Sequence, residues 1–595
     1  MLHHLLKFSQ ESEPGFSAKS IRWQIELSED GSLLGVTPLG DPKRGLLHRK
    51  VPVMHNMGAG GRSHFLVESV GVVALFLAND DDKKVGDNTE RRRRFFIDLL
   101  KEPSREDPDL GVIAAFLESG EKSESLRVTF EQKGAKPAHL AKFTVDGRDP
   151  LVKPAVLAWW RSWRERDLAA GNAEVGADMV DMLTGHAVSP AATHPKVMGL
   201  GRVGGLATGD VVAGFDKKAF QSFGLSQSCN SAMSEETARG YVDALNDLVR
   251  QAKPLAGALV AHWFKEKLQA TEDDALAWII EPPEAQAASA AARAKGLLDS
   301  IRDGRRPDLA GNAYYALTLS GASGRVMVRD WMEGSFPDLV ANAHRWFEDM
   351  EIAGLEGGMA KDRKFEAVLT SLLKPKPRGQ DYPDWVRPLG GMRAALYRCA
   401  VVGRPIPREA MAKLAALLPA FLAGKDLREA LSRKAKQGQD SGGPTISTLF
   451  ARIGLVKAYF IRKEVTGMTA CLNMEHPDPA YHCGRLLAAL SGLQKAALGD
   501  VGASVVQRYY AGAAQRPGLV FGDLVRNSKN HLHKLSPGLA HWHEDRLAEI
   551  VARLKEFPRT LNLEEQTMFA LGYYHQLAHD RAGKSRETAA SAKEA

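Results

Sequence analysis

The chain has 595 residues, of which 44% are hydrophobic and 25% are charged, and its formal net charge is +7. This length predicts about two to four domains, and the composition is that of an ordinary globular chain. The modest positive charge fits an anionic partner but does not identify one.

The cysteines, the N-terminus and the apolar runs argue against several classes of protein. None of the four cysteines belongs to a C-x-x-C pair, so we expect neither a zinc ribbon nor a redox motif, and their scarcity fits a reducing compartment. The N-terminal MLHHLLKFSQESEPG lacks an apolar stretch of signal-peptide length, and the longest apolar run, Val70–Ala78, is too short to cross a bilayer. We therefore expect a cytoplasmic protein that needs no cofactor.

The first part of the chain mixes strand and helix patterns. Ile21–Leu27 alternates apolar and polar residues as a half-buried strand does, and a turn at 29–31 leads to a return strand at 33–36. Ser234 can cap a helix that begins with two carboxylates. Further strands are expected at 126–130, 142–145, 255–264 and 312–319, further helices at 90–101, 111–118 and 286–302, and a turn at 321–324; 65–78 and 325–331 fit either a strand or a helix.

Beyond residue 345 the strand patterns fade and helical periodicity dominates. Helices are expected at 365–373, 392–402, 408–422, 445–463, 480–498, 505–514, 518–535, 540–557 and 563–579, the last ones separated by Pro517, Pro537 and Pro558. We predict an α+β protein with a mixed α/β N-terminal region at 1–345, a helical connecting region at 346–470 and an all-α bundle at 471–595.

A glycine-rich stretch, residues 199–230, has the composition of a surface that holds nucleic acid. Six glycines fall between Gly199 and Gly214, and glycine lets a backbone approach another surface closely. Lysines, amides and hydroxyls, which contact phosphates and base edges, follow them. These polar residues are Lys217, Lys218, Gln221, Ser222, Gln227, Ser228 and Asn230.

The same stretch has two other interpretations. Gly199-Leu-Gly-Arg-Val-Gly204 matches G-x-G-x-x-G, but Thr193-His-Pro-Lys precedes it and further glycines follow, so the strand and helix that a dinucleotide site needs are missing. A glycine-rich hairpin with polar decoration is the plainer alternative.

Three other features offer a structural and a binding interpretation. Asn56–Ser63 is a second glycine-rich loop, either a finger that touches a nucleic-acid groove or a simple connection. Arg91–Arg94 are expected to be a solvated helix face, with phosphate contact as the alternative. The indoles of Trp159, Trp160 and Trp163 are expected at the edge of a core rather than under stacked bases.

The C-terminal part is rich in cations and histidines. Its cations could form a stripe that binds single-stranded nucleic acid, or they could simply be solvated surface residues, and both interpretations explain them equally well. These cations are Arg485, Lys495, Arg508, Arg526, Lys529 and Lys534. The pairs His531/His533 and His541/His543 are two residues apart, so on a helix their side chains do not face each other, and we expect no metal site.

Four passages resemble one known family along almost the whole chain. They are Trp23-Gln-Ile-Glu-Leu with Asp30-Gly31 and Val51-Pro-Val; the glycine-rich run into Gly214–Asn230; Leu317-Thr-Leu-Ser-Gly-Ala-Ser-Gly-Arg-Val with Arg329-Asp-Trp331; and Ala480-Tyr-His-Cys-Gly-Arg-Leu-Leu-Ala-Ala-Leu, Arg508-Tyr-Tyr, Pro517-Gly-Leu-Val-Phe and Leu571-Gly-Tyr-Tyr-His-Gln576. In this order they resemble the large subunit of the type I-C CRISPR surveillance complex (Cascade).

This resemblance implies a DNA-binding subunit of a ribonucleoprotein, not an enzyme. The subunit would read the short motif beside the target (PAM) in duplex DNA, help to open the duplex and stabilise the R-loop, while the guide CRISPR RNA reads the sequence. Its partners would be the other Cascade subunits and a helicase-nuclease recruited in trans. The C-terminal bundle would resemble the small subunit, with Met468 or Met474 as a candidate internal start.

The residues and the resemblance together give two sets of candidate contacts. Those for the PAM and duplex DNA are Asn56, Arg62, Ser63, Lys217, Lys218, Gln221, Gln227, Ser228 and Asn230; those for a single strand are Arg485, Arg508, Arg526, Lys529 and Lys534.

Two rival functions remain. In a hydrolase the nucleophile would be Ser222, Ser226, Ser228 or Cys229, yet no G-x-S-x-G elbow and no carboxylate pair in a metal-binding motif accompanies them. A protein-only scaffold is the other alternative.

Overall fold

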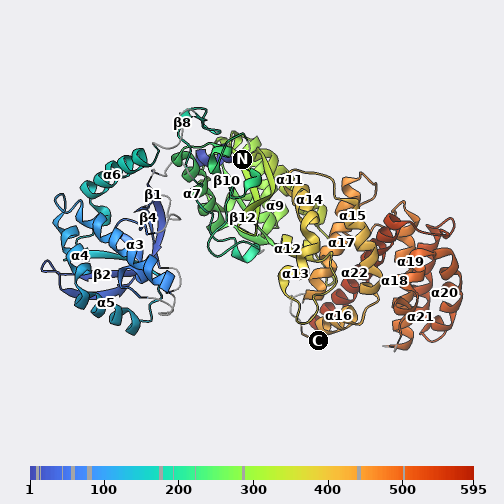
Figure 1. Ribbon diagram of the computed structural model, residues 1–595. Coiled ribbons are helices and arrows are strands. Elements are labelled where there is room, and N and C mark those ends of the chain that lie inside the picture. The colour runs from blue at the N-terminus through green and yellow to red at the C-terminus, as the bar shows by residue number, and fades with distance from the viewer. Residues whose placement is uncertain are drawn as a thin grey trace. The chain divides into compact units, whose positions relative to one another are not determined.

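Figure 1 shows the computed structural model of the chain. The structure describes residues 1–594 except 9–12, 14, 43–44, 55–60, 77–82, 173–178, 192, 221–222, 284–288, 438–443, 500 and 502. The chain divides into two compact units. Unit 1 comprises Met1–Arg250 with Gly321–Met327, and unit 2 comprises Gln251–Ser320 with Val328–Ala595.

The sheet of unit 1 has the strand order β3-β2-β6-β5. Its strands are β2 (Trp23–Leu27), β3 (Leu33–Pro38), β5 (Val67–Ser69) and β6 (Leu140–Val145). β2 runs parallel to β6 and antiparallel to β3, with Ile25 opposite Phe143 on one side and Val36 on the other. Buried and half-buried residues alternate along β2, so the predicted strand is confirmed. A separate ribbon pairs β1 (Phe16–Ile21) with β4 (Leu46–Pro52).

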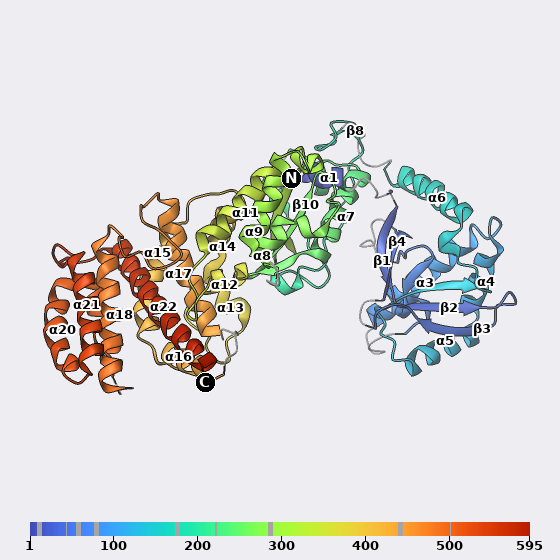
Figure 2. The same cartoon turned by 180° about the vertical axis from the view of Figure 1, so that it is seen from behind.

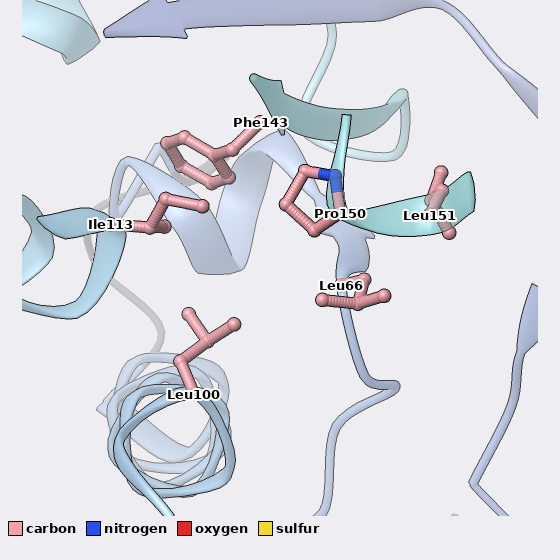
Figure 3. A pocket seen from close by; sticks show the side chains of 6 residues that line it. All are labelled: Leu66, Leu100, Ile113, Phe143, Pro150 and Leu151. Atoms are coloured by element: carbon pink, nitrogen blue, oxygen red, sulfur yellow. The ribbon is translucent and has the colours of Figure 1, made fainter. Parts of the chain in front are cut away.

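Helices pack around this sheet (Figure 1). They are α2 (Val70–Val73), α3 (Lys83–Lys101), α4 (Pro108–Glu118), α5 (Gly120–Gln132) and α6 (Pro154–Asn172). Figure 3 shows a small crevice whose lining is wholly apolar: Leu66, Leu100, Ile113, Phe143, Pro150 and Leu151. Without polar groups to orient a ligand, this crevice is part of the hydrophobic core.

The strand predicted at 126–130 is wrong, because this segment lies inside α5. Alternating apolar and polar residues suggested a strand, but Leu126 and Phe130 are also four residues apart, and both are buried on one helix face. Ser119 begins the helix by accepting a hydrogen bond from the backbone N–H of Lys122. The 65–78 segment contains both expected elements, β5 and then α2.

The tryptophans of α6 belong to the core, as expected. The Trp160 indole is fully buried and stacks on that of Trp163, with ring centroids 5.3 Å apart, and on the ring of Phe65. Trp159 and Trp163 are half-buried and pack against the same core.

The rest of unit 1 contains α1 (Leu2–Phe8), the hairpin β7 (Met179–Val180) and β8 (Ala187–Val188), and α7 (Glu235–Gln251). The predicted cap of α7 is confirmed, since the Ser234 hydroxyl accepts a hydrogen bond from the backbone N–H of Thr237 over 3.0 Å.

Unit 2 begins with an antiparallel sheet in the order β12-β11-β10-β9. Its strands are β9 (Lys253–Leu255), β10 (Ala258–Phe264), β11 (Ala313–Ala322) and β12 (Arg325–Ser335). The predicted turn joins β11 to β12 with positive φ angles at Ser323 and Gly324, and 325–331 is a strand. The tip of this hairpin, Gly321–Met327, belongs to unit 1.

Helices form the remainder of unit 2, which confirms the α+β class with a helical C-terminal part. They are α8 (Ala275–Ile280), α9 (Ala290–Arg302), α10 (Pro307–Ala310), α11 (Phe336–Met350), α12 (Phe365–Thr370), α13 (Tyr382–Val386), α14 (Gly390–Val401), α15 (Arg408–Leu422), α16 (Lys425–Gln437), α17 (Pro444–Arg462), α18 (Pro479–Leu498), α19 (Val505–Gln515), α20 (Pro517–Leu532), α21 (Pro537–Ala552) and α22 (Leu563–Glu594).

The C-terminal bundle, α18–α22, depends on a close approach of two helices. A Cβ atom added to Gly484 of α18 would lie 1.9 Å from the Phe569 carbonyl oxygen, and one added to Gly572 of α22 would lie 2.0 Å from that of Tyr481. Only glycine fits at this crossing. Figure 2 shows α22 crossing α18, with α20 and α21 beside α18.

Candidate nucleic-acid interface

The glycine-rich half of the 199–230 stretch packs against the β11–β12 hairpin tip. The backbones of Gly204 and Gly205 lie so close to Gly321 that a Cβ at Gly321 would be 2.1 Å from the Gly205 Cα. Val197 bridges to Asp210, and Val211 bridges to Arg325 of the tip. Gly204 and Gly205 therefore make a close backbone contact within unit 1, which we call the glycine clasp. Gly199, Gly201 and Gly204 are nevertheless exposed.

The following residues, 215–230, form what we call the recognition segment. Lys217 and Lys218 are exposed, and neither forms an ion pair with a residue that the structure describes. Asp216 faces Arg325 at 3.5 Å, and the Arg325 guanidinium lies over the Phe220 ring, 5.1 Å from its centroid. The hairpin tip thus contacts the start of the segment, while Lys217 and Lys218 remain available to a partner.

Phe223 was missed by the sequence interpretation. Its side chain is 100% exposed, although phenylalanine is normally buried, and its φ of 54° lies in the left-handed region that a bulky residue rarely adopts. Such backbone strain costs about 1–2 kcal/mol, and strained residues are often found at functional sites. The only signal in the sequence was an aromatic residue before Gly224 in a polar segment.

The other predicted residues of the segment have different environments. Gln227 is exposed with a φ of 47°, and its carbonyl accepts a hydrogen bond from the Asn230 amide over 3.0 Å. Ser228 is only 4% exposed, so its predicted contact with DNA disagrees with its burial. Gln221 and Ser222 lie outside the described residues.

The N-terminal loop supplies less than the sequence suggested. Asn56 lies outside the described residues, as do 55 and 57–60. The Arg62 guanidinium donates two hydrogen bonds to the Asp167 carboxylate, at 2.8 and 3.1 Å, and Ser63 is fully buried. Both side chains are therefore engaged within unit 1, which argues against their predicted role.

The four arginines of α3, Arg91–Arg94, were expected to be a solvated helix face or to contact phosphates, and neither expectation fits all four. Arg91 and Arg94 are exposed, but Arg92 forms an ion pair with the buried Glu68 at 2.7 Å. Arg93 is buried, donates hydrogen bonds to the Leu117 carbonyl and the Ser123 hydroxyl, and has its pKa lowered by burial to about 10. Two of the four arginines are thus structural.

In the bundle, Arg485 does not belong to a surface stripe. Its side chain is 1% exposed and donates two hydrogen bonds to the Glu549 carboxylate, at 2.9 and 3.1 Å, and one to the Gln576 amide oxygen. The role predicted for Arg485 with a single strand disagrees with this burial.

The other cations of the predicted stripe are exposed on α19, on α20 and just after α20: Arg508, Arg526, Lys529 and Lys534. Arg526 forms an ion pair with Asp523, and both side chains are largely exposed, so the pair is weak and leaves Arg526 able to change partner. Figure 2 shows α20 at the outer side of the bundle.

In the described part of the chain, no three His, Cys, Asp or Glu side chains are arranged to hold a metal ion. Among the same residues, no helix combines the length and apolar character that crossing a bilayer requires.

Comparison with known proteins adds one finding. A family model described as CRISPR-associated protein (Cas_Csd1) matches residues 5–580, which is nearly the whole chain. Comparison with curated proteins gives no match.

Proposed function

Because the chain belongs to the CRISPR-associated protein Csd1 family, the type I-C large subunits, we propose that it recognises the PAM in duplex DNA and helps to open that duplex. The guide CRISPR RNA, held with the other Cascade subunits, would then read the target by pairing. The observation that carries the proposal is the recognition segment, which combines two exposed lysines with a fully exposed, strained Phe223.

Each part of the segment has a separate task. Lys217 and Lys218 contact phosphates and set the position of the segment on the duplex. Gln227 reads base edges, since an amide can donate and accept hydrogen bonds in a groove. The phenyl ring of Phe223 enters between base pairs, which costs a few kcal/mol of stacking, as apolar wedges do in other DNA-bending proteins.

The glycine clasp supports this task from behind. A side chain that separates base pairs needs a rigid protein backbone behind it. The contact of Gly204 and Gly205 with Gly321 restrains the chain just before the recognition segment begins. The Arg325 guanidinium also lies over the Phe220 ring, in the first turn of the segment. The glycines thus act indirectly, by supporting the residues that touch DNA.

The displaced strand is held elsewhere on the same chain. The exposed cations of α19 and α20 suit the phosphates of a single strand and stabilise the R-loop. A separate helicase-nuclease is recruited in trans and cuts the DNA. Both candidate internal starts, Met468 and Met474, precede α18, so a separate product would contain the whole C-terminal bundle. Mass spectrometry of the purified complex would detect it.

The test is DNA binding by the complex assembled with guide RNA. We expect tight binding to a target duplex with the PAM and at least tenfold weaker binding to the same duplex without it. No binding to any DNA would contradict the proposal and favour a protein-only scaffold. Metal-dependent cleavage of labelled DNA by the purified chain alone, in magnesium or manganese, would favour a hydrolase.

A further inference from the structure

A short cationic loop in unit 2 lies outside both surfaces described so far. We call residues 374–380, Lys-Pro-Lys-Pro-Arg-Gly-Gln, the basic loop. The chain enters it after α12, where the buried Arg452 guanidinium donates hydrogen bonds to the carbonyls of Ser371, at 2.8 Å, and Leu373, at 3.0 Å. The loop therefore starts from a fixed base.

The loop is also closed on itself. The Trp385 indole N–H donates a hydrogen bond to the Lys374 carbonyl over 3.0 Å, which ties α13 to the start of the loop. The Lys376 ammonium donates one to the Gln380 carbonyl over 2.7 Å, and Gly379 makes the turn with a φ of 79°. Prolines on both sides of Lys376 restrict the backbone further. These contacts and the prolines constrain the backbone of the loop.

The loop presents its cations without neutralising partners. Lys374, Lys376 and Arg378 are exposed, and none forms an ion pair with a described residue. Of the two exposed carboxylates that follow, Asp384 is already paired with Arg387. A loop that orders three positive charges this close together, at a cost in mutual repulsion, is suited to an anionic partner.

An aromatic ring lies directly after these cations. Tyr382 is 41% exposed and meets the Trp385 ring edge to face, with centroids 5.8 Å apart, so its ring is supported from one side. A basic surface beside an exposed aromatic ring is the arrangement with which proteins bind single strands: cations follow the phosphates and the ring stacks on a base.

We propose that the basic loop and Tyr382 bind single-stranded nucleic acid without sequence preference. The phosphates contact Lys374, Lys376 and Arg378, and one unpaired base stacks on the Tyr382 ring. Duplex DNA offers no free base face, so it would use the cations alone. The proposal rests on the proposed function only in taking nucleic acid as the partner, because residues 374–382 belong neither to the recognition segment nor to α19 or α20.

The test uses the full chain and a fluorescent oligo(dT) of about 20 nucleotides, longer than the sites that single-strand binders cover. In anisotropy titrations, the triple variant Lys374→Ala, Lys376→Ala, Arg378→Ala is expected to bind at least tenfold more weakly. Its slope of log K against log salt is expected to fall by about 2, at about 0.7 for each phosphate that is no longer neutralised. Tyr382→Ala is expected to bind about tenfold more weakly, and Tyr382→Phe to bind like the unaltered chain.

The control removes the same charge from another face of unit 2. Arg293→Ala, Lys295→Ala, Arg302→Ala takes three exposed cations from α9, and we expect less than a twofold change. The proposal would be overturned if the control variant and the loop variant lost the same affinity for oligo(dT). It would also be overturned if Tyr382→Ala bound oligo(dT) with an unchanged Kd, or if Tyr382→Ala weakened binding to duplex DNA as much as binding to oligo(dT). A loop variant that binds oligo(dT) normally but no longer retains a subunit of the complex would assign the loop to a protein and also overturn it. Variants of Phe223 are expected to leave oligo(dT) binding by this loop intact, so the two proposals can fail independently.

Discussion

The recognition segment and the C-terminal bundle look alike in sequence and differ in structure. Residues 199–230, which end in the recognition segment, and the bundle both combine glycines with lysines or arginines, and both suggested a nucleic-acid surface. In the bundle, Gly484 and Gly572 allow two helices to cross, and Arg485 is neutralised by Glu549. In the recognition segment, Lys217 and Lys218 have no such ion pair with described residues. A buried ion pair such as Arg485–Glu549 removes a cation from the candidate contacts, whereas an exposed cation stays accessible to a partner.

The largest expected effect is a difference in stability between variants of two arginines, Arg485 and Arg508, which the sequence analysis placed in one stripe. Arg485→Ala leaves the Glu549 carboxylate and the Gln576 amide without their partner, so we expect a loss of about 3–5 kcal/mol in the free energy of unfolding of the bundle. Arg508→Ala, on the exposed face of α19, should change it by less than about 0.5 kcal/mol. Denaturant unfolding followed by circular dichroism measures both, and similar losses would show that the two arginines do not differ.

Acid should destabilise the bundle through its buried histidines. Burial lowers the pKa of His476 to about 4 and that of His575 to about 3, below the ordinary value of 6.5. The folded state therefore keeps both rings neutral while the unfolded chain takes up protons, so their contribution is fully present above pH 6.5 and is lost as the pH falls.

We expect a loss of about 2 kcal/mol for each of these histidines between pH 6.5 and 5. Urea unfolding at several pH values measures it, and His575→Gln is expected to weaken the pH dependence. The same slope in this variant and in the unaltered chain would contradict the assignment.

Phe223→Ala is expected to slow the opening of duplex DNA without lowering the stability of the protein. Its ring contacts no core, so stability should not fall, and relief of the left-handed strain by Phe223→Gly should raise it by up to about 1 kcal/mol. Opening of a PAM-containing duplex, followed by 2-aminopurine fluorescence, is expected to slow at least tenfold in the assembled complex with Phe223→Ala, since a wedge recovers about 1–3 kcal/mol per stacked base. Unchanged opening rates would remove Phe223 from the mechanism.

The smallest expected effect is on DNA binding, and it distinguishes residues that read the PAM from residues that contact the DNA phosphates. Gln227→Ala should reduce the preference for the correct PAM about tenfold, and Gln221→Ala serves as a second variant of the same kind. Lys217→Ala with Lys218→Ala should weaken binding to all sequences alike and lower the salt slope by about 2. Equal losses on every sequence for Gln227→Ala, in competition assays at fixed salt, would reassign that residue to the phosphates.

Local patterns predicted much of the fold correctly. The alternation at Ile21–Leu27, the cap at Ser234 and the turn before Arg325 are all short-range features, and each is present. The segment 126–130 failed because its apolar residues satisfy both periods, and only packing decides between them.

The candidate site was harder to predict because its decisive contacts are distant in sequence. Arg62 is bound by Asp167, and Arg485 by Glu549, 105 and 64 residues away along the chain. No local pattern shows that an arginine already has an anion. The exposure of Phe223 was likewise invisible, since composition alone predicts that a phenylalanine is buried.

We propose that the recognition segment lies against the duplex beside the PAM. The most direct test of this claim places the photocrosslinking residue p-benzoylphenylalanine at position 223 in the complex bound to a target duplex. Crosslinks are predicted at the base pairs next to the PAM, and a matched probe at position 542 on α21 is expected to avoid those base pairs. The absence of crosslinks from position 223 to DNA in a complex that still binds its target, or crosslinks only far from the PAM, would contradict the claim.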